Sequence, residues 1–545
     1  MKKRIIIAAV IILVVAAVTA ATVLLPRYPA TDTISLTNDG QGETAAGEVS
    51  GINKGQGTGE ASGINGGHGE GQGAAGEAQN TTAEGQDAGA AEASGGDTSD
   101  SSGETGGQEQ HTFSGIRELN IYTYDDKLVE LVRAYVRRHP ELIFEVNGYN
   151  YVTEDKFFNL SLINESIQSD SKDVVDIYCV PDVYSHEFIK GNYSRHACTY
   201  KELGIDVDAA LKKADIPQNI IDAGINPDGE VIALPYMTGA SVFMYRRSVA
   251  QKVWGTDDPD KIAGIIGAGT NKWDRFMEAA QTLKEHGCYI VPGYIDIAFM
   301  VDTSFDASEI NPKWLEFMDV SKKMLYKGYM KDTQYWSDEW INEMNGKGDK
   351  PVFGFVIPYE YFIFLSTSDD FFKSTAGDWA ICVPPFNTIA GGCTGILVNK
   401  DSPNKDVLGP LIEWLTLDCS ESGLQHGLAN HTLADRNGQM YGYNGGEWPV
   451  ISGTVLKNAE CSIDFLGGQN IYPVIYDALN TPTGRHDNYG IEIYTFSLWL
   501  EETRAYLAGI KDRETAVADY IKAEKEEVSS LKKTFEEYGI SFLLP

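Results

Sequence analysis

The pattern of hydrophobic and polar positions changes twice along the chain. Residues 5–25 form an uninterrupted apolar run directly after the basic segment MKKR. Residues 30–112 are then dominated by small and polar residues, and the stretch from Ala30 to His111 contains no Phe, Trp or Tyr. From residue 113 onward, short apolar stretches alternate with amphipathic ones. The pattern predicts an apolar helix, a disordered linker and then a folded part.

The apolar run predicts that the protein works outside the cell membrane. It has 21 residues without a charge, whereas a secretory signal usually has an apolar region of about 7–15 residues and a membrane span needs about 20. Positive residues ahead of such a run keep the N-terminus in the cytoplasm. A retained anchor within residues 1–29 and cleavage after Val18-Thr19-Ala20 both stay open. No cysteine follows the run closely, so a lipid-modified N-terminal cysteine is not expected.

The start of the folded part alternates between strand and helix patterns. In chain order, we expect a strand, a helix, a strand, a helix and a strand at residues 117–124, 125–140, 142–149, 153–170 and 174–182. This alternation predicts a parallel sheet with helical crossovers. In such open α/β sheets, ligands collect beyond the carboxyl ends of the strands.

The segment PDGEVIALPYMTGASVFMYRRSVAQKVWG, residues 227–255, has a different pattern. A Pro-Asp-Gly turn leads into an extended run at 230–236 that Pro235 prevents from being helical. A second extended run follows at 240–247, and then a short helix that we expect to begin at Ser248 and end at Gly255. Further along, the expected elements are a helix at 271–287, strands at 350–362 and 377–386, and a glycine-rich crossing, strand and helix within 391–418.

The order of these segments resembles that of the family 1 extracellular solute-binding proteins of ABC importers, which include the maltodextrin-binding proteins. The matching segments are DGEVIALPY with VFMYRR, KWDRFMEAAQTL, KPVFGFVI, DWAICVPPF, GGCTGILVNKDSPNKDVLGPLIEWL and ETAVADYIKAEKEEVSSL. The resemblance covers about residues 117–530.

This resemblance implies a two-lobed α/β fold of the periplasmic-binding-protein type II, with a solute held in a cleft between the lobes. Lobe 1 would comprise residues 117–235 plus 391–450, and lobe 2 residues 236–390 plus 451–545. Binding would close the lobes by hinge bending, and the partner would be the permease of an ABC transporter. The expected hinge residues are Pro235, Gly391, Gly392 and Gly395.

Candidate ligand-binding residues lie at the expected strand ends and crossings. Carbohydrate sites combine aromatic platforms with a few polar groups, and 11% of this chain is aromatic. Asp125 could instead interact only with the N-terminus of its helix, Trp379 could be a core residue, and Glu360 could be solvated. The candidates are Tyr124, Asp125, Asp182, Tyr236, Tyr359, Glu360, Trp379 and Trp448.

Composition narrows the partners further. The 44 Lys and Arg against 78 Asp and Glu give a net charge of −34, which disfavours nucleic acid and anionic lipid as partners. The 7 cysteines include no CxxC pair, so we expect mostly buried thiols rather than a zinc site or a disulfide framework.

The sequence also lacks the common catalytic motifs. It contains no GxSxG, HExxH, Walker A or EF-hand loop, and its 9 histidines do not pair at metal-ligand spacing. We therefore expect a binding protein, not an enzyme, with no cofactor and no metal. A membrane-tethered sensor or adhesion module remains an alternative. A secreted polysaccharide-cleaving enzyme is another, because its paired carboxylates need only be close in space. The solute expected by resemblance is an oligosaccharide.

Overall fold

The protein is described from a computed structural model. The structure describes residues 117–540 apart from residues 124, 143, 151–155, 169–173, 181–184, 304, 306–307, 359–372, 387–394, 435–449 and 482–490. The expected N-terminal helix and linker lie outside the described residues. Within the described part of the chain, no helix is both long enough and apolar enough to span a membrane.

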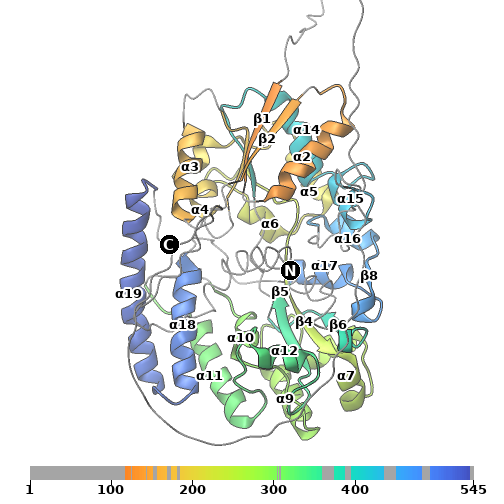
Figure 1. The fold of residues 1–545 in the computed structure, drawn as a ribbon, viewed down its shortest axis with the longest axis vertical. Coiled ribbons are helices and arrows are strands. Elements are labelled where there is room, and N and C mark those ends of the chain that lie inside the picture. The colour runs from red at the N-terminus through yellow and green to blue at the C-terminus, as the bar shows by residue number, and fades with distance from the viewer. Residues whose placement is uncertain are drawn as a thin grey trace, which may run out of the picture. The chain divides into compact units, whose positions relative to one another are not determined.

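A four-stranded sheet has the order β2-β1-β3-β7, and its paired strands β1 and β2 lie side by side in Figure 1. Its strands are β1 (Arg117–Thr123), β2 (Phe144–Asn150), β3 (Ile177–Cys179) and β7 (Ile396–Val398). β1 pairs in parallel with β2 and β3, and α2 (Asp126–Arg138) and α3 (Lys156–Gln168) lie between these strands in the chain. The predicted alternation and parallel pairing are confirmed. β7 arrives from far along the chain and pairs with β3 in the antiparallel direction.

Helix α2 shows how the local pattern produces this layer. Leu128, Leu131, Val132 and Tyr135 repeat at helical spacing and are all buried, as expected for an amphipathic helix packed on a sheet. The side chain of Asp125 caps the helix by accepting a hydrogen bond from the backbone N–H of Lys127.

Asp176 ties the late strand β7 to the early strands. Its carboxylate is 1% exposed and accepts hydrogen bonds from the backbone N–H of Asn120 (2.8 Å), from Ser402 Oγ (2.5 Å) and from Asn404 Nδ2 (3.0 Å). Burial raises the pKa of Asp176, while these bonds and the charge of Arg117 oppose the rise. A buried carboxylate is tolerated where its oxygens are hydrogen-bonded in this way.

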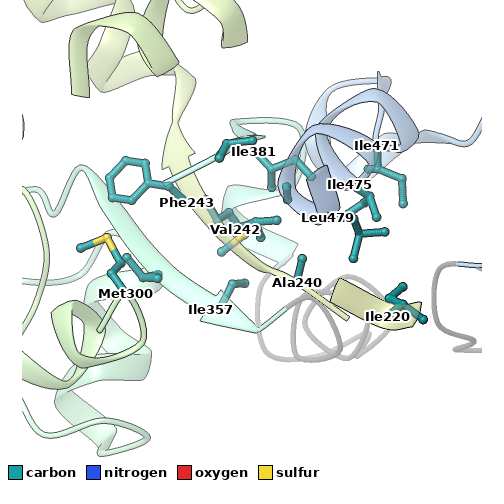
Figure 2. Close-up of a cluster of buried hydrophobic side chains, with 14 of the residues drawn as sticks. Ile220, Ala240, Val242, Phe243, Met300, Ile357, Ile381, Ile471, Ile475 and Leu479 are labelled. Atoms are coloured by element: carbon teal, nitrogen blue, oxygen red, sulfur yellow. The ribbon is translucent and has the colours of Figure 1, made fainter. Parts of the chain in front are cut away.

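A three-stranded sheet has the order β5-β4-β6, and both of its pairings are antiparallel. Its strands are β4 (Ser241–Arg246), β5 (Gly354–Pro358) and β6 (Trp379–Cys382). Figure 2 shows Val242, Phe243, Ile357 and Ile381 of these strands gathered in one cluster with side chains of a later helix. A Cβ atom on Gly354 would lie 2.2 Å from Phe243 Cζ, so only glycine lets the ring pack against β5.

The remaining elements complete the core. Those between β3 and β6 are α4 (Ser185–Ile189), η2 (Asn192–His196), α5 (Val207–Ala214), α6 (Gln218–Ala223), α7 (Arg247–Trp254), α8 (Pro259–Ile266), α9 (Asp274–Glu285), α10 (Tyr294–Ala298), α11 (Pro312–Lys327), α12 (Asp338–Met344) and η3 (Lys373–Thr375). Those after β7 are α14 (Lys405–Thr416), α15 (Leu424–Ala429), α16 (Gly453–Asn458), β8 (Ser462–Ile463), η5 (Asp464–Leu466), β9 (Gln469–Asn470), α17 (Tyr472–Asn480), α18 (Ile491–Leu507) and α19 (Arg513–Glu537).

Helix α19 lies beside α18 (Figure 1) and is longer than the matching sequence segment. Near its start, Arg513 makes a bidentate ion pair with Asp319 of α11. Near its end, Phe535 joins the hydrophobic cluster of α3, β3 and α4, and Tyr193 donates a hydrogen bond to the carbonyl of Gly539. One end of α19 therefore contacts α11, and the other end packs in the hydrophobic cluster around β3.

Two local expectations are wrong. Residues 230–236 do not form a regular strand, since they make only isolated bridges through Val231 and Leu234. Ser248 does not cap α7, because the helix already begins at Arg247. Its backbone N–H and hydroxyl instead donate to the carboxylate of Asp378, so a residue from a distant segment caps this helix end.

Candidate functional site

Three chain segments meet where the chain passes between the two larger sheets. The first, residues 234–240, leads into β4 and is called the crossing segment below. Leu234 forms a bridge with Ile396 at the start of β7, and Met237 forms one with Val450. The crossing segment therefore contacts both later passages of the chain, at 395–396 and at 450.

The central feature of this region is a hydrogen bond between two predicted ligand-binding residues. Tyr236 Oη donates to Asp125 Oδ2 at 2.5 Å, although the two residues are 111 positions apart. Tyr236 is only 3% exposed and Asp125 is half-buried. Asp125 directly follows the carboxyl end of β1, with only residue 124 between. The structure thus brings a phenol and a carboxylate together beside the end of a parallel strand.

Asp125 serves two partners at once. Its Oδ1 accepts the N–H of Lys127 at 3.0 Å, which is the helix-capping role considered above, and its Oδ2 accepts the hydroxyl of Tyr236. Asp125 can therefore cap α2 with one oxygen and contribute to the candidate site with the other. Such bonds hold the carboxylate in one orientation.

The backbone of the crossing segment is held in place by Gln425, a residue that the sequence analysis did not select. Gln425 is fully buried in α15 and its Nε2 donates to the carbonyls of Tyr236 (2.7 Å) and Leu415 (3.0 Å). Its Oε1 accepts the N–H groups of Ile451 (2.9 Å) and Ser452 (3.2 Å). One side chain therefore joins the crossing segment to the passage at 450–452. A polar residue on the buried face of a short apolar helix was the only available signal.

Tyr200 makes a second such link. Its hydroxyl accepts the N–H of Leu234 at 2.9 Å and donates to the carbonyl of Ile396 at 3.3 Å. It is fully buried, and burial raises its pKa well above the usual range, so the hydroxyl stays neutral.

Two of the predicted hinge residues lie within the described part of the chain. Pro235 sits in the crossing segment, between the bridge at Leu234 and the hydroxyl of Tyr236. Gly395 is buried, and a Cβ atom there would lie 2.9 Å from the Cβ of Ala233. Glycine at this position lets the two passages approach each other closely.

Trp379 is a core residue in this structure and is not part of the pair. It is fully buried in β6, its Nε1 donates to Thr375 Oγ1 at 2.9 Å, and its ring stacks on Phe465 and meets Phe355 edge-on. The guanidinium of Arg246 lies 5.1 Å from the ring centroid. Because protein atoms surround this ring completely, Trp379 is a core residue, and we leave it out of the proposed site.

Among the described residues, no three His, Cys, Asp or Glu side chains are grouped so as to hold a metal ion. The described cysteines are free thiols and nearly all are buried.

The other predicted ligand-binding and hinge residues lie outside the described residues. They are Tyr124, Asp182, Tyr359, Glu360, Trp448, Gly391 and Gly392.

Comparison with known proteins identifies the fold. No protein-family model and no curated protein matches the sequence. A solved structure described as an extracellular solute-binding protein of family 1 matches with a TM-score of 0.57 at 13% identity, covering 75% of this chain and 99% of that one. The sugar-binding protein MalE from Xanthomonas citri matches with a TM-score of 0.53 at 13% identity, covering 77% and 99%. The chain therefore has the two-lobed α/β fold of these binding proteins, which confirms the predicted resemblance at the level of fold.

Proposed function

We propose that the protein is an extracellular solute-binding protein that captures a carbohydrate between its two lobes and delivers it to an ABC transporter permease. The fold supports this proposal, because one of its structural relatives is named as a sugar-binding protein. The observation that carries it is the hydrogen bond between Tyr236 and Asp125, which joins the crossing segment to the end of β1.

The chemistry of this pair suits a carbohydrate. Sugars offer hydroxyl groups as donors, and a carboxylate can accept about four hydrogen bonds. Lys127 and Tyr236 hold the carboxylate of Asp125 in place, so a solute would meet an acceptor that is already oriented. Pre-organised acceptors increase affinity because less freedom is lost on binding. The rings of Tyr124, Tyr359 and Trp448 are the candidates for apolar platforms under the sugar.

Capture would be coupled to closure of the lobes. We assign residues 117–235 plus 391–450 to lobe 1 and residues 236–390 plus 451–545 to lobe 2. The hinge would lie at Pro235, Gly391, Gly392 and Gly395. A solute favours the closed form only to the extent that it binds that form more tightly. The protein acts by binding alone and performs no chemistry on the solute.

We infer the location from the N-terminal sequence. The apolar run at 5–25 would hold the protein at the outer face of the membrane, and residues 30–112 would act as a flexible tether. The absence of a lipid-attachment cysteine near the run keeps a second candidate open, a membrane-tethered sensor that shares the capture step but signals to a membrane receptor.

A thermal-shift screen against mono- and oligosaccharides, peptides and polyamines tests this function. A solute present at about 100 times its dissociation constant stabilises a one-site binder by about 2.7 kcal/mol, which is a visible shift. We expect a saccharide to raise the melting temperature and to be recovered uncleaved. Recovery of fragments would instead support an enzyme, and stabilisation by peptides or polyamines alone would contradict the carbohydrate assignment.

A further inference from the structure

Asp296 is a buried carboxyl group with no role in the proposed site. It lies in α10 and is 0% exposed. The indole of Trp340 and the backbone of Val356 lie close to it. Neither of its carboxylate oxygens accepts a hydrogen bond of ordinary geometry from the described residues, and Trp340 Nε1 likewise has no partner there. An ionised carboxylate is strongly disfavoured in such surroundings unless something compensates its charge.

The ionisable group that acts electrostatically on Asp296 is another buried acid, Glu343 of α12, which is 2% exposed. Its Oε1 accepts hydrogen bonds from Thr333 Oγ1 (3.2 Å) and lies 3.1 Å from Lys331 Nζ. Its Oε2 is buried and unpartnered among the described residues. A second negative charge beside an ionised Asp296 would raise the energy of both.

Lys331, the cation paired with Glu343, is already shared. Lys331 Nζ forms ion pairs with Glu339 and Asp349 as well as with Glu343. One ammonium group therefore serves three carboxylates before Asp296 is counted. None of these ion pairs includes Asp296.

The elements packed against α10 supply no compensating charge in the described residues. β5 has the sequence GFVIP, without a titratable side chain. The buried face of α11 consists of Trp314, Phe317, Met318, Ser321 and Met324. On α10 itself, Tyr294 interacts electrostatically with Arg504, Asp332 and Glu501, but Asp296 is influenced by Glu343.

We propose that Asp296 is held protonated in the folded protein and shares its site with Glu343, so that this carboxyl pair makes the fold more stable as the pH falls. The direction follows from proton linkage. Burial, and then the charge of Glu343, raise the pKa of Asp296 well above its usual value. Between the unfolded and the folded pKa the folded state binds the extra proton, so the stabilisation is fully present below about pH 4 and is lost as the pH rises.

This inference is independent of the solute, because it depends only on packing around α10. It would matter most for a protein outside the cell, where the pH is not held constant. Most ionised carboxylates that gain partners on folding have the opposite dependence and favour higher pH.

The test is the substitution Asp296→Asn in the full chain, kept in mild detergent. All 9 tryptophans follow residue 250, so their fluorescence follows unfolding of the folded part alone. We expect the difference in melting temperature, variant minus parent, to grow as the pH rises from about 4.5 to 7. The folding constant of the parent should fall relative to the variant by up to about tenfold per pH unit. Parallel curves, with the variant equally destabilised at every pH, would overturn the proposal.

A matched control is Asp349→Asn, which also alters the surroundings of Lys331. Hydrogen bonding to Lys331 lowers the pKa of this exposed carboxylate, so its contribution is already fully present above the unfolded pKa of about 4, and the stability difference between this variant and the parent should stay nearly constant from about pH 4.5 to 7. If Asp296→Asn does not fold, infrared absorption of the unmodified chain decides the matter. We expect a protonated carboxyl band at pH 7 that shifts in D2O, and its absence would reject the proposal.

Discussion

Asp176, beside the β2-β1-β3-β7 sheet, and Asp296, in α10 next to β5, are two aspartates that are both almost completely buried. Asp176 accepts three hydrogen bonds and lies near Arg117. Neither carboxylate oxygen of Asp296 accepts a hydrogen bond of ordinary geometry from the described residues, and the ionisable group that acts on it is the buried acid Glu343. The comparison teaches that burial alone does not determine what a carboxyl group does. The neighbouring groups determine whether a buried carboxyl group is ionised and accepts several hydrogen bonds or remains protonated and neutral.

The largest expected loss of stability is at Asp176, the aspartate with hydrogen-bond partners. Asp176→Ala leaves Asn120 N–H, Ser402 and Asn404 without their shared acceptor. Unsatisfied buried groups cost about 1–3 kcal/mol each before relaxation, so we expect a loss of about 3 kcal/mol or more at pH 7. Urea unfolding monitored by tryptophan fluorescence measures it. A loss below about 1 kcal/mol would mean that the network does not stabilise β7.

An intermediate effect is expected at Lys331, the shared cation. Lys331→Met leaves Glu343 with Thr333 as its only described partner. We expect a loss of about 2 kcal/mol at pH 8. The loss should shrink towards pH 5, because Glu343, whose pKa burial already raises, can then take up a proton in the folded state. Unfolding curves at the two pH values test this, and an equal loss at both would contradict the charge argument.

The smallest effect is expected for an exposed ion pair near Asp176. Arg117 pairs with Asp406, whose side chain is 61% exposed. This pairing lowers the pKa of Asp406, so its contribution is present above the unfolded pKa and disappears as the pH falls through the folded value. Solvent screens such pairs, and Asp406→Asn should cost about 0.5 kcal/mol or less at pH 7. A cost as large as that of Asp176→Ala would remove the distinction between buried and exposed carboxylates.

The sequence predicted the elements better than their contacts. Leu128, Leu131, Val132 and Tyr135 mark α2 because helical periodicity is local. The antiparallel pairing of β4 with β5 could not be read, since strand direction depends on the path of the intervening chain. The core position of Trp379 was left open because an apolar strand has the same pattern whether its tryptophan faces a core or a ligand.

The candidate site shows the same limit. Tyr236 and Asp125 were each selected from their positions at a crossing and at a strand end. Their hydrogen bond was not predicted, because nothing local relates residues 111 positions apart. Gln425 and Tyr200 were missed because their importance lies only in the distant backbone groups that they join.

Calorimetric titration of Tyr236→Phe with the saccharide found by screening tests the central claim most directly. The substitution removes only the hydroxyl that holds Asp125, and Tyr245→Phe, whose hydroxyl donates to the carbonyl of Asp257, is the matched control. We expect Tyr236→Phe to weaken binding about tenfold, or about 1.4 kcal/mol, while the control keeps the parental affinity. Unchanged affinity in the folded Tyr236→Phe variant would remove the Tyr236–Asp125 pair from the site and contradict the account.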